Sequence, residues 1–187
     1  MHYVIRALVY ADTPEEALQT AKDDVFEKLV DPEYNAGFDY YQTFDNEGSC
    51  VSGKGRWGDL PAVMRADSKE GKQYIKEGWK YMCREQKYHM DKIRKWFKKG
   101  GTLHDFRSGD SKRNQGGLLR YHFNRLGSYS GDTYLLYDND GEAIQTKRHL
   151  QDVMEKWDCI YGDKTKHVRN PYDAHNHIYV VLADVHG

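Results

Sequence analysis

The sequence has few cysteines and no long apolar run. Its three cysteines, Cys50, Cys83 and Cys159, have neither CxxC nor zinc-finger spacing. An odd number of unpatterned cysteines is typical of free thiols in a reducing compartment and argues against a disulfide framework. No apolar segment approaches the roughly 20 residues that a membrane-spanning helix needs, and the first apolar stretch is too short for a secretory signal. We therefore expect a cytoplasmic protein with no membrane span.

Aromatic residues are abundant instead. The chain of 187 residues contains 15 Tyr, 6 Phe and 4 Trp, although only 39% of its residues are hydrophobic and 30% are charged. Disordered chains of low hydrophobicity lack such large apolar side chains. The length suits one sizeable core and is short for two. These features predict a single α+β domain over residues 1–187.

The periodicity of apolar residues predicts the elements of that domain. Helices are expected from residue 14, where Thr13, Pro14 and Glu16 form a capping box, over about 68–99, and over 146–157. Strands are expected over 3–10, 38–44, 118–123, 133–137 and 177–185, with a short strand and loop in the glycine-rich stretch 52–58. The polar segment at about 102–117 is expected to be a mobile loop.

This order of elements predicts a mixed or antiparallel sheet with helices mainly on one face. The opening strand, helix and strand suit a split βαβ unit of the ferredoxin-like type. The segments 3–10 and 177–185 are apolar on both faces, so we expect them to be adjacent and central in the sheet. Each contains one charge, Arg6 and Asp184, and these two could pair if the strands are antiparallel neighbours.

Two glycine motifs are weak signals. Residues 53–58 match GxGxxG, but no helical pattern follows directly, as a dinucleotide site requires. Residues 138–142 (DNDGE) place glycine too early for a calcium-binding loop. We interpret the first as a loop and the second as a tight turn.

The histidines give two alternative readings. His175 and His177 share one face of the last strand, so with Asp173 they could bind a metal, and His104, Asp105 or His122 could supply a further ligand. Histidine is also common at strand ends, and no metal-binding motif is present. We therefore expect no cofactor or metal.

His104, Asp105 and His122 could instead carry acid–base chemistry on a phosphate ester, with nearby arginines holding the charge. Sequence alone does not bring these side chains together, and a solvated loop is the plainer interpretation. No serine or cysteine has the context of an activated nucleophile.

The helix expected over 68–99 separates its charges. On an ideal helical wheel, seven cations lie roughly 60–140° from Ile75, which marks the core stripe, and no acid shares that sector. We call these seven residues the cationic flank: Lys69, Lys72, Lys76, Lys80, Lys87, Arg94 and Lys98. Arg107 and Arg113 would continue it into the following loop. Residues 67–125 carry 16 Lys/Arg and 7 Asp/Glu, a net charge of +9, while the segments on either side are acidic.

These features favour a non-enzymatic protein that binds a polyanion, either nucleic acid or the acidic surface of a nucleic-acid-handling protein. Five aromatic residues interleave with the cations in the sequence and could stack on bases: Tyr74, Tyr81, Tyr88, Trp96 and Tyr121. The flank could also dock on the acidic segments of its own chain or of a second copy in a homodimer. The alternative is a small hydrolase or nuclease-like enzyme that uses the histidines, with or without a metal.

Overall fold

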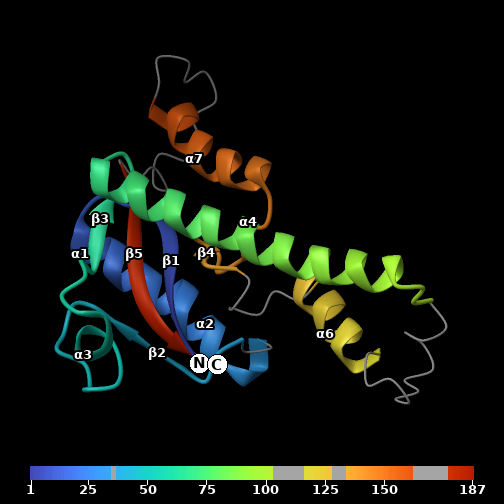
Figure 1. Ribbon diagram of the computed structural model, residues 1–187. Helices are drawn as coiled ribbons and strands as arrows, with labels where there is room; N and C mark the ends of the chain where they lie inside the picture. Colours follow the sequence, from blue (N-terminus) through green and yellow to red (C-terminus); the bar gives the residue numbers. More distant parts are fainter. Residues whose placement is uncertain (35–36, 103–115, 128–133, 162–176) are drawn as a thin grey trace.

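The computed structural model describes residues 1–34, 37–102, 116–127, 134–161 and 177–187 (Figure 1). They form one α+β domain around a five-stranded mixed sheet. No helix in these ranges is long and apolar enough to cross a membrane.

The centre of the sheet is an antiparallel pair of long strands. β1 (His2–Ala11) and β5 (His177–His186) pair along their whole length, and β2 (Tyr40–Thr43) and β3 (Val63–Arg65) both pair antiparallel with β5. β4 (Leu136–Tyr137) runs parallel to β1, so the main order is β2-β5-β1-β4. Most inner residues of β1 and β5 are completely buried. The prediction that these two strands are adjacent and central is confirmed.

The opening of the chain is the expected split βαβ unit. β1 and β2 are both antiparallel to β5, which lies between them, so they are parallel to each other. The helix that connects them comprises α1 (Pro14–Thr20), a π-helical stretch η1 (Ala21–Phe26) and α2 (Glu27–Val30).

The start of this helix follows the capping box. The Thr13 hydroxyl accepts a hydrogen bond from the Glu16 N–H at 3.1 Å, and the Glu16 carboxylate accepts one from the Asp12 N–H at 2.8 Å. Both bonds satisfy backbone donors that a helix N-terminus leaves open. The helix ends at Asp31, before the 3-10 turn η2 (Pro32–Tyr34).

The long helix is one continuous element, α4 (Lys69–Lys98). Ser68 caps it, because its hydroxyl accepts from the Gly71 N–H at 2.9 Å. Its two internal glycines mark close approaches to the body of the protein. A Cβ at Gly71 would lie 2.1 Å from the Arg65 carbonyl oxygen, and one at Gly78 would lie 3.0 Å from Cδ of Arg6 on β1. The glycines therefore let α4 lie against the sheet without a kink.

Two strands expected from the sequence are helices. Residues 118–123 lie within α6 (Gly116–Gly127), where Leu119 and His122 are buried one helical turn apart. Their apolar alternation suggested a strand, but α4 provides the partner surface that a helix needs. The stretch 52–58 contains a helical turn, α3 (Lys54–Trp57), and the short strand of this region is β3.

Helices cover both faces of the sheet (Figure 1). α4 contacts one face through Gly78, and Tyr10 on that face donates a hydrogen bond to the Val153 carbonyl of α7 (Lys147–Tyr161) at 2.7 Å. α6 packs on α4. The opposite face carries α1 and α2, where Phe26 packs on Tyr41. Most helices lie on one face, as expected, but the first helix covers the other.

Candidate functional site

The cationic flank is exposed along the whole of α4. All seven of its side chains are exposed, whereas the core stripe of the same helix contains the buried residues Ile75, Met82, His89 and Ile93. The buried stripe ends before Phe97, which is 39% exposed. The predicted separation of charges on this helix therefore places the cations in solvent.

Within the described ranges, the chain's own acids leave six of the seven flank residues without an ion pair. Among the residues that the structure describes, only Arg94 of the seven has an ion pair, with Asp91 at 3.4 Å, and both of these side chains are largely exposed. Exposed pairs of this kind contribute little to stability. Arg107 and Arg113, the predicted continuation of the flank, lie outside the described residues.

The interleaved aromatic residues lie elsewhere. Tyr74, Tyr81 and Tyr88 follow one another every seven residues, which places them roughly 100–140° from Ile75 on the side opposite the cations. Their cationic neighbours are not members of the flank: Tyr74 lies under Arg6 at 5.9 Å, Tyr81 near Arg84 at 4.9 Å, and Tyr88 near Lys92 at 5.0 Å. Tyr121 lies on α6 beside Arg125. The flank has no aromatic platform from this set.

The sequence pattern groups His122 with His104 and Asp105 for acid–base chemistry, but in the structure its partner is His89. Nδ1 of His122 lies 2.8 Å from Nδ1 of His89, and both residues are buried between α6 and α4. Burial lowers the pKa of both imidazoles, and nearby charged side chains shift each pKa further. His104 and Asp105 lie outside the described residues.

Charged residues surround this histidine pair. Glu85 raises the pKa of His89, which burial and Arg125 lower. His89 and Lys92 add to the effect of burial in lowering the pKa of His122. Both imidazoles are thus buried between two helices with lowered pKa values, which suits packing better than a group exposed to substrate.

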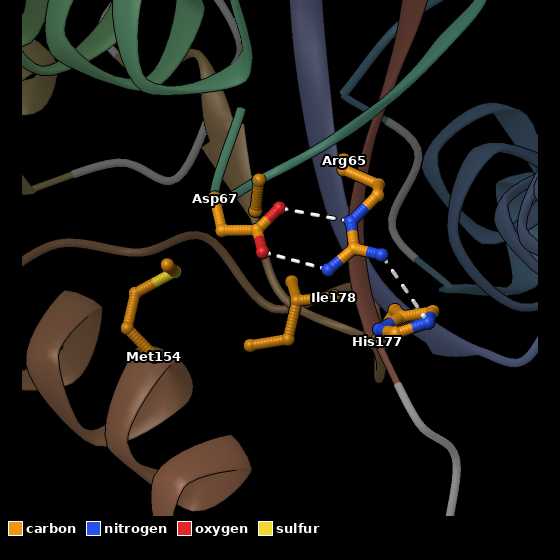
Figure 2. A pocket seen from close by; sticks show the side chains of 6 residues that line it. Arg65, Asp67, Met154, His177 and Ile178 are labelled. Atoms are coloured by element: carbon orange, nitrogen blue, oxygen red, sulfur yellow. Dashed lines mark hydrogen bonds and ion pairs between the residues drawn. The ribbon is translucent and has the colours of Figure 1, made fainter. Parts of the chain in front are cut away.

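His177, a member of the alternative metal group, lines a small pocket with Arg65, Asp67, Met154 and Ile178 (Figure 2). The Arg65 guanidinium forms two bonds to Asp67, at 2.9 and 2.7 Å, and donates a third to Nε2 of His177 at 3.3 Å. A fixed cation at Nε2 disfavours a metal ion there. His175 and Asp173 lie outside the described residues.

No group of three or more His, Cys, Asp or Glu side chains in the described ranges is arranged to hold a metal ion.

Arg6 and Asp184 do not form the pair considered from the sequence, although their strands are antiparallel neighbours. The Arg6 guanidinium donates to the Val4 carbonyl and lies against Tyr74, and burial lowers its pKa. Asp184 is completely buried and has two other donors. Nδ1 of His2 lies 3.1 Å from both of its carboxylate oxygens, and the Gly53 N–H donates to it at 2.9 Å.

The Gly53 bond also explains the GxGxxG segment. Its first glycine, with a φ of 54°, directs its N–H at the chain's own carboxylate. Four of its six residues form the helical turn α3, which the loop interpretation did not expect, and the segment closes over the end of β5 without opening the N-terminus of a long helix.

A cluster that sequence reasoning missed lies beside Asp184. His2, Tyr40 and His186 are in register across β1, β2 and β5, and their rings lie 5.0 to 6.0 Å apart. Nδ1 of His186 is bonded to Asp39 at 2.8 Å. We call His2, His186, Tyr40, Asp39 and Asp184 the sheet-end cluster. The antiparallel register expected for the first and last strands is the signal that could have brought His2 opposite His186.

One family model matches residues 1–187, and its description is a domain of unknown function, DUF7995. No curated protein and no solved structure matches the chain.

Proposed function

We propose that this chain, which belongs to the DUF7995 family, binds the phosphate backbone of nucleic acids through the cationic flank of α4. The observation that carries the proposal is a row of seven exposed cations with no acid in the same sector of the helix. Lysine and arginine bind phosphate by charge and by hydrogen bonds, and such contacts dominate the affinity of proteins for nucleic acids.

The length of the row suits an extended polyanion. At 1.5 Å per residue, the Cα atoms of Lys69 and Lys98 lie roughly 44 Å apart along the helix axis. Because α4 is continuous, the cations form one line on a rigid support. A small anion would use only two or three of them, whereas a nucleic-acid backbone passes many charges along such a line.

The position of the aromatic residues favours backbone contacts over base contacts. The tyrosines of α4 lie on the other side of the helix, so they are not available to stack on bases held at the flank. The other exposed residues in the cationic sector include Cys83 and Met90, which do not read base edges. Binding is therefore expected to be independent of sequence and to include duplexes.

The salt dependence of binding tests the proposal. If four to six cations neutralise phosphates, log affinity for duplex DNA falls with log salt at a slope of roughly −3 to −5. The variant Lys76→Glu/Lys80→Glu loses two of these contacts, so its slope is shallower by about two and its affinity is lower for every sequence. Fluorescence anisotropy over a salt series measures both quantities.

A matched control is available on the same helix. Lys95→Glu/Lys99→Glu makes the same change of charge outside the cationic sector, and both side chains are exposed. Its slope is expected to equal that of the wild type. Equal effects of the two double variants would refute a role for the flank, as would absence of binding to DNA and RNA at low salt. Binding to an acidic protein but to no nucleic acid would assign the flank to the other polyanion suggested by the sequence.

The exposed thiols of Cys50 and Cys83 suit a reducing environment, which supports a proposed location in the cytoplasm.

A further inference from the structure

The sheet-end cluster places two imidazoles side by side. The register pairs His186 with Tyr40 on one side and with His2 on the other. The His2 and His186 rings meet edge to face with centroids 5.0 Å apart, and the Tyr40 ring is nearly parallel to that of His186 at 5.4 Å. The cluster lies at the end of the sheet where β1 begins and β5 ends (Figure 1).

Each imidazole is oriented by a carboxylate. Nδ1 of His2 is bonded to the buried Asp184, and Nδ1 of His186 is bonded to Asp39. A carboxylate at Nδ1 fixes the ring and its tautomer and leaves Nε2 for proton transfer, as in hydrolases with a histidine–aspartate pair. Nε2 of His2 has only the Tyr40 hydroxyl at 3.4 Å, and Nε2 of His186 has no hydrogen-bond partner among the described residues.

Two oriented imidazoles about 5 Å apart can act as a base and an acid in one reaction. Because the cluster contains no serine or cysteine, the nucleophile is either water or a group of the substrate itself. RNA brings such a group, since its 2′-hydroxyl lies next to the phosphodiester bond. The Tyr40 ring, 40% exposed, offers a surface on which a base can stack.

We propose that His2 and His186 cleave RNA phosphodiester bonds as a general base and a general acid. The neutral imidazole takes the proton of the 2′-hydroxyl, and the 2′-oxygen forms a bond to phosphorus. The bond from phosphorus to the 5′-oxygen breaks, and the imidazolium gives its proton to that oxygen. The products are a 2′,3′-cyclic phosphate and a 5′-hydroxyl end, and no oxidant, metal or water is consumed.

This inference adds a reaction and a substrate class to the proposed function, and it relies on the cationic flank only for holding the strand. Binding by the cationic flank and cleavage by the histidines can be tested, and can fail, independently of each other. Duplex DNA reports on the flank without cleavage, because DNA lacks the 2′-hydroxyl. Loss of flank cations is expected to raise KM for RNA and leave kcat unchanged.

The experiment uses the full chain and a short single-stranded RNA with one fluorescent end. The wild type is expected to produce fragments that end in a 2′,3′-cyclic phosphate, identified by mass spectrometry. The same strand with one 2′-deoxy position is expected to remain uncut there. His186→Gln lowers kcat by about 100-fold or more, which is the usual contribution of one acid or base.

A third histidine–aspartate pair gives the control. Nε2 of His149 lies 2.9 Å from Asp138 outside the cluster, so His149→Gln is expected to keep the wild-type rate. His2→Gln is the second test, and its fold is checked by circular dichroism because His2 is bonded to a buried carboxylate. His186 lies nearer the surface, so its variant tests the site even if the His2 variant unfolds.

Three results would overturn the proposal: no cleavage by the wild type, cleavage at the 2′-deoxy position, or equal rates for His186→Gln and His149→Gln.

Discussion

The molecule holds two histidine pairs in opposite environments. In the sheet-end cluster, His2 and His186 are each bonded to a carboxylate. Between α4 and α6, His89 and His122 are bonded to each other, and burial and nearby cations lower the pKa of His122. The first arrangement gives each imidazole a carboxylate as its partner, and the second buries two imidazoles against each other, which disfavours positive charge on either ring. Both pairs are histidines, so the group bonded to Nδ1, a carboxylate or a second imidazole, determines whether the ring is suited to acid–base chemistry or to packing.

The largest expected effect comes from removing the buried carboxylate. Asp184→Ala leaves Nδ1 of His2 and the Gly53 N–H without their acceptor at a completely buried position. We expect a loss of about 3 kcal/mol in the free energy of unfolding, because an unpaired buried group retains its full desolvation cost. Urea denaturation measures this loss.

Asp39→Ala is the comparison within the same cluster. The Asp39 side chain is 70% exposed, so its bond to His186 is partly replaced by water. The loss of stability is expected to be small. A similar loss for both variants would show that burial does not distinguish the two carboxylates.

Acid is expected to lower the stability of the folded protein through the His89–His122 pair. The folded pKa values of His89 and His122 lie below the unfolded value of about 6.5. As pH falls from about 6.5 toward those lower values, the unfolded chain binds protons that the folded chain does not, so stability falls. Thermal unfolding between pH 7.5 and 5 measures this dependence.

The double variant His89→Leu/His122→Leu tests the origin of that dependence. Replacing both partners with apolar groups of similar size is expected to leave stability near neutral pH little changed. Its stability should vary less with pH than that of the wild type. An unchanged dependence on pH would contradict the assignment to this pair.

The smallest expected effects are pKa shifts of His89 and His122 when a neighbouring charge is removed. Lys92 lowers the pKa of His122, so Lys92→Gln is expected to raise that pKa toward its usual value. Glu85 acts in the opposite direction on His89, so Glu85→Gln is expected to lower the pKa of His89 further. NMR titration of the imidazole resonances measures both shifts. Shifts of the same sign in the two variants would contradict the placement of these charges.

The long elements could be predicted because local signals agree with the fold. β1 and β5 are apolar on both faces, and α4 covers nearly the whole segment 68–99 that its periodicity indicates. The exposure of the cationic flank followed from helical periodicity alone, because charged side chains beside a core stripe face water.

Other features depend on partners that the local sequence does not contain. Leu119 and His122 are buried only because α4 lies against α6, so their segment could be read as a strand. β3 is three residues long and takes its pairing from β5. The sheet-end cluster joins the two ends of the chain, and only the register of β1 with β5 brings His2 beside His186.

The pairing of β1 with β5 has a consequence for synthesis. Residues 12–176 are translated between these strands, which at 5 to 20 residues per second takes roughly 10 to 30 s. During that time β1 has an unpaired, apolar edge that could associate with another chain. The closing of a loop this long is also slow relative to local helix formation. The nascent chain is therefore expected to expose this edge of β1 until β5 leaves the ribosome.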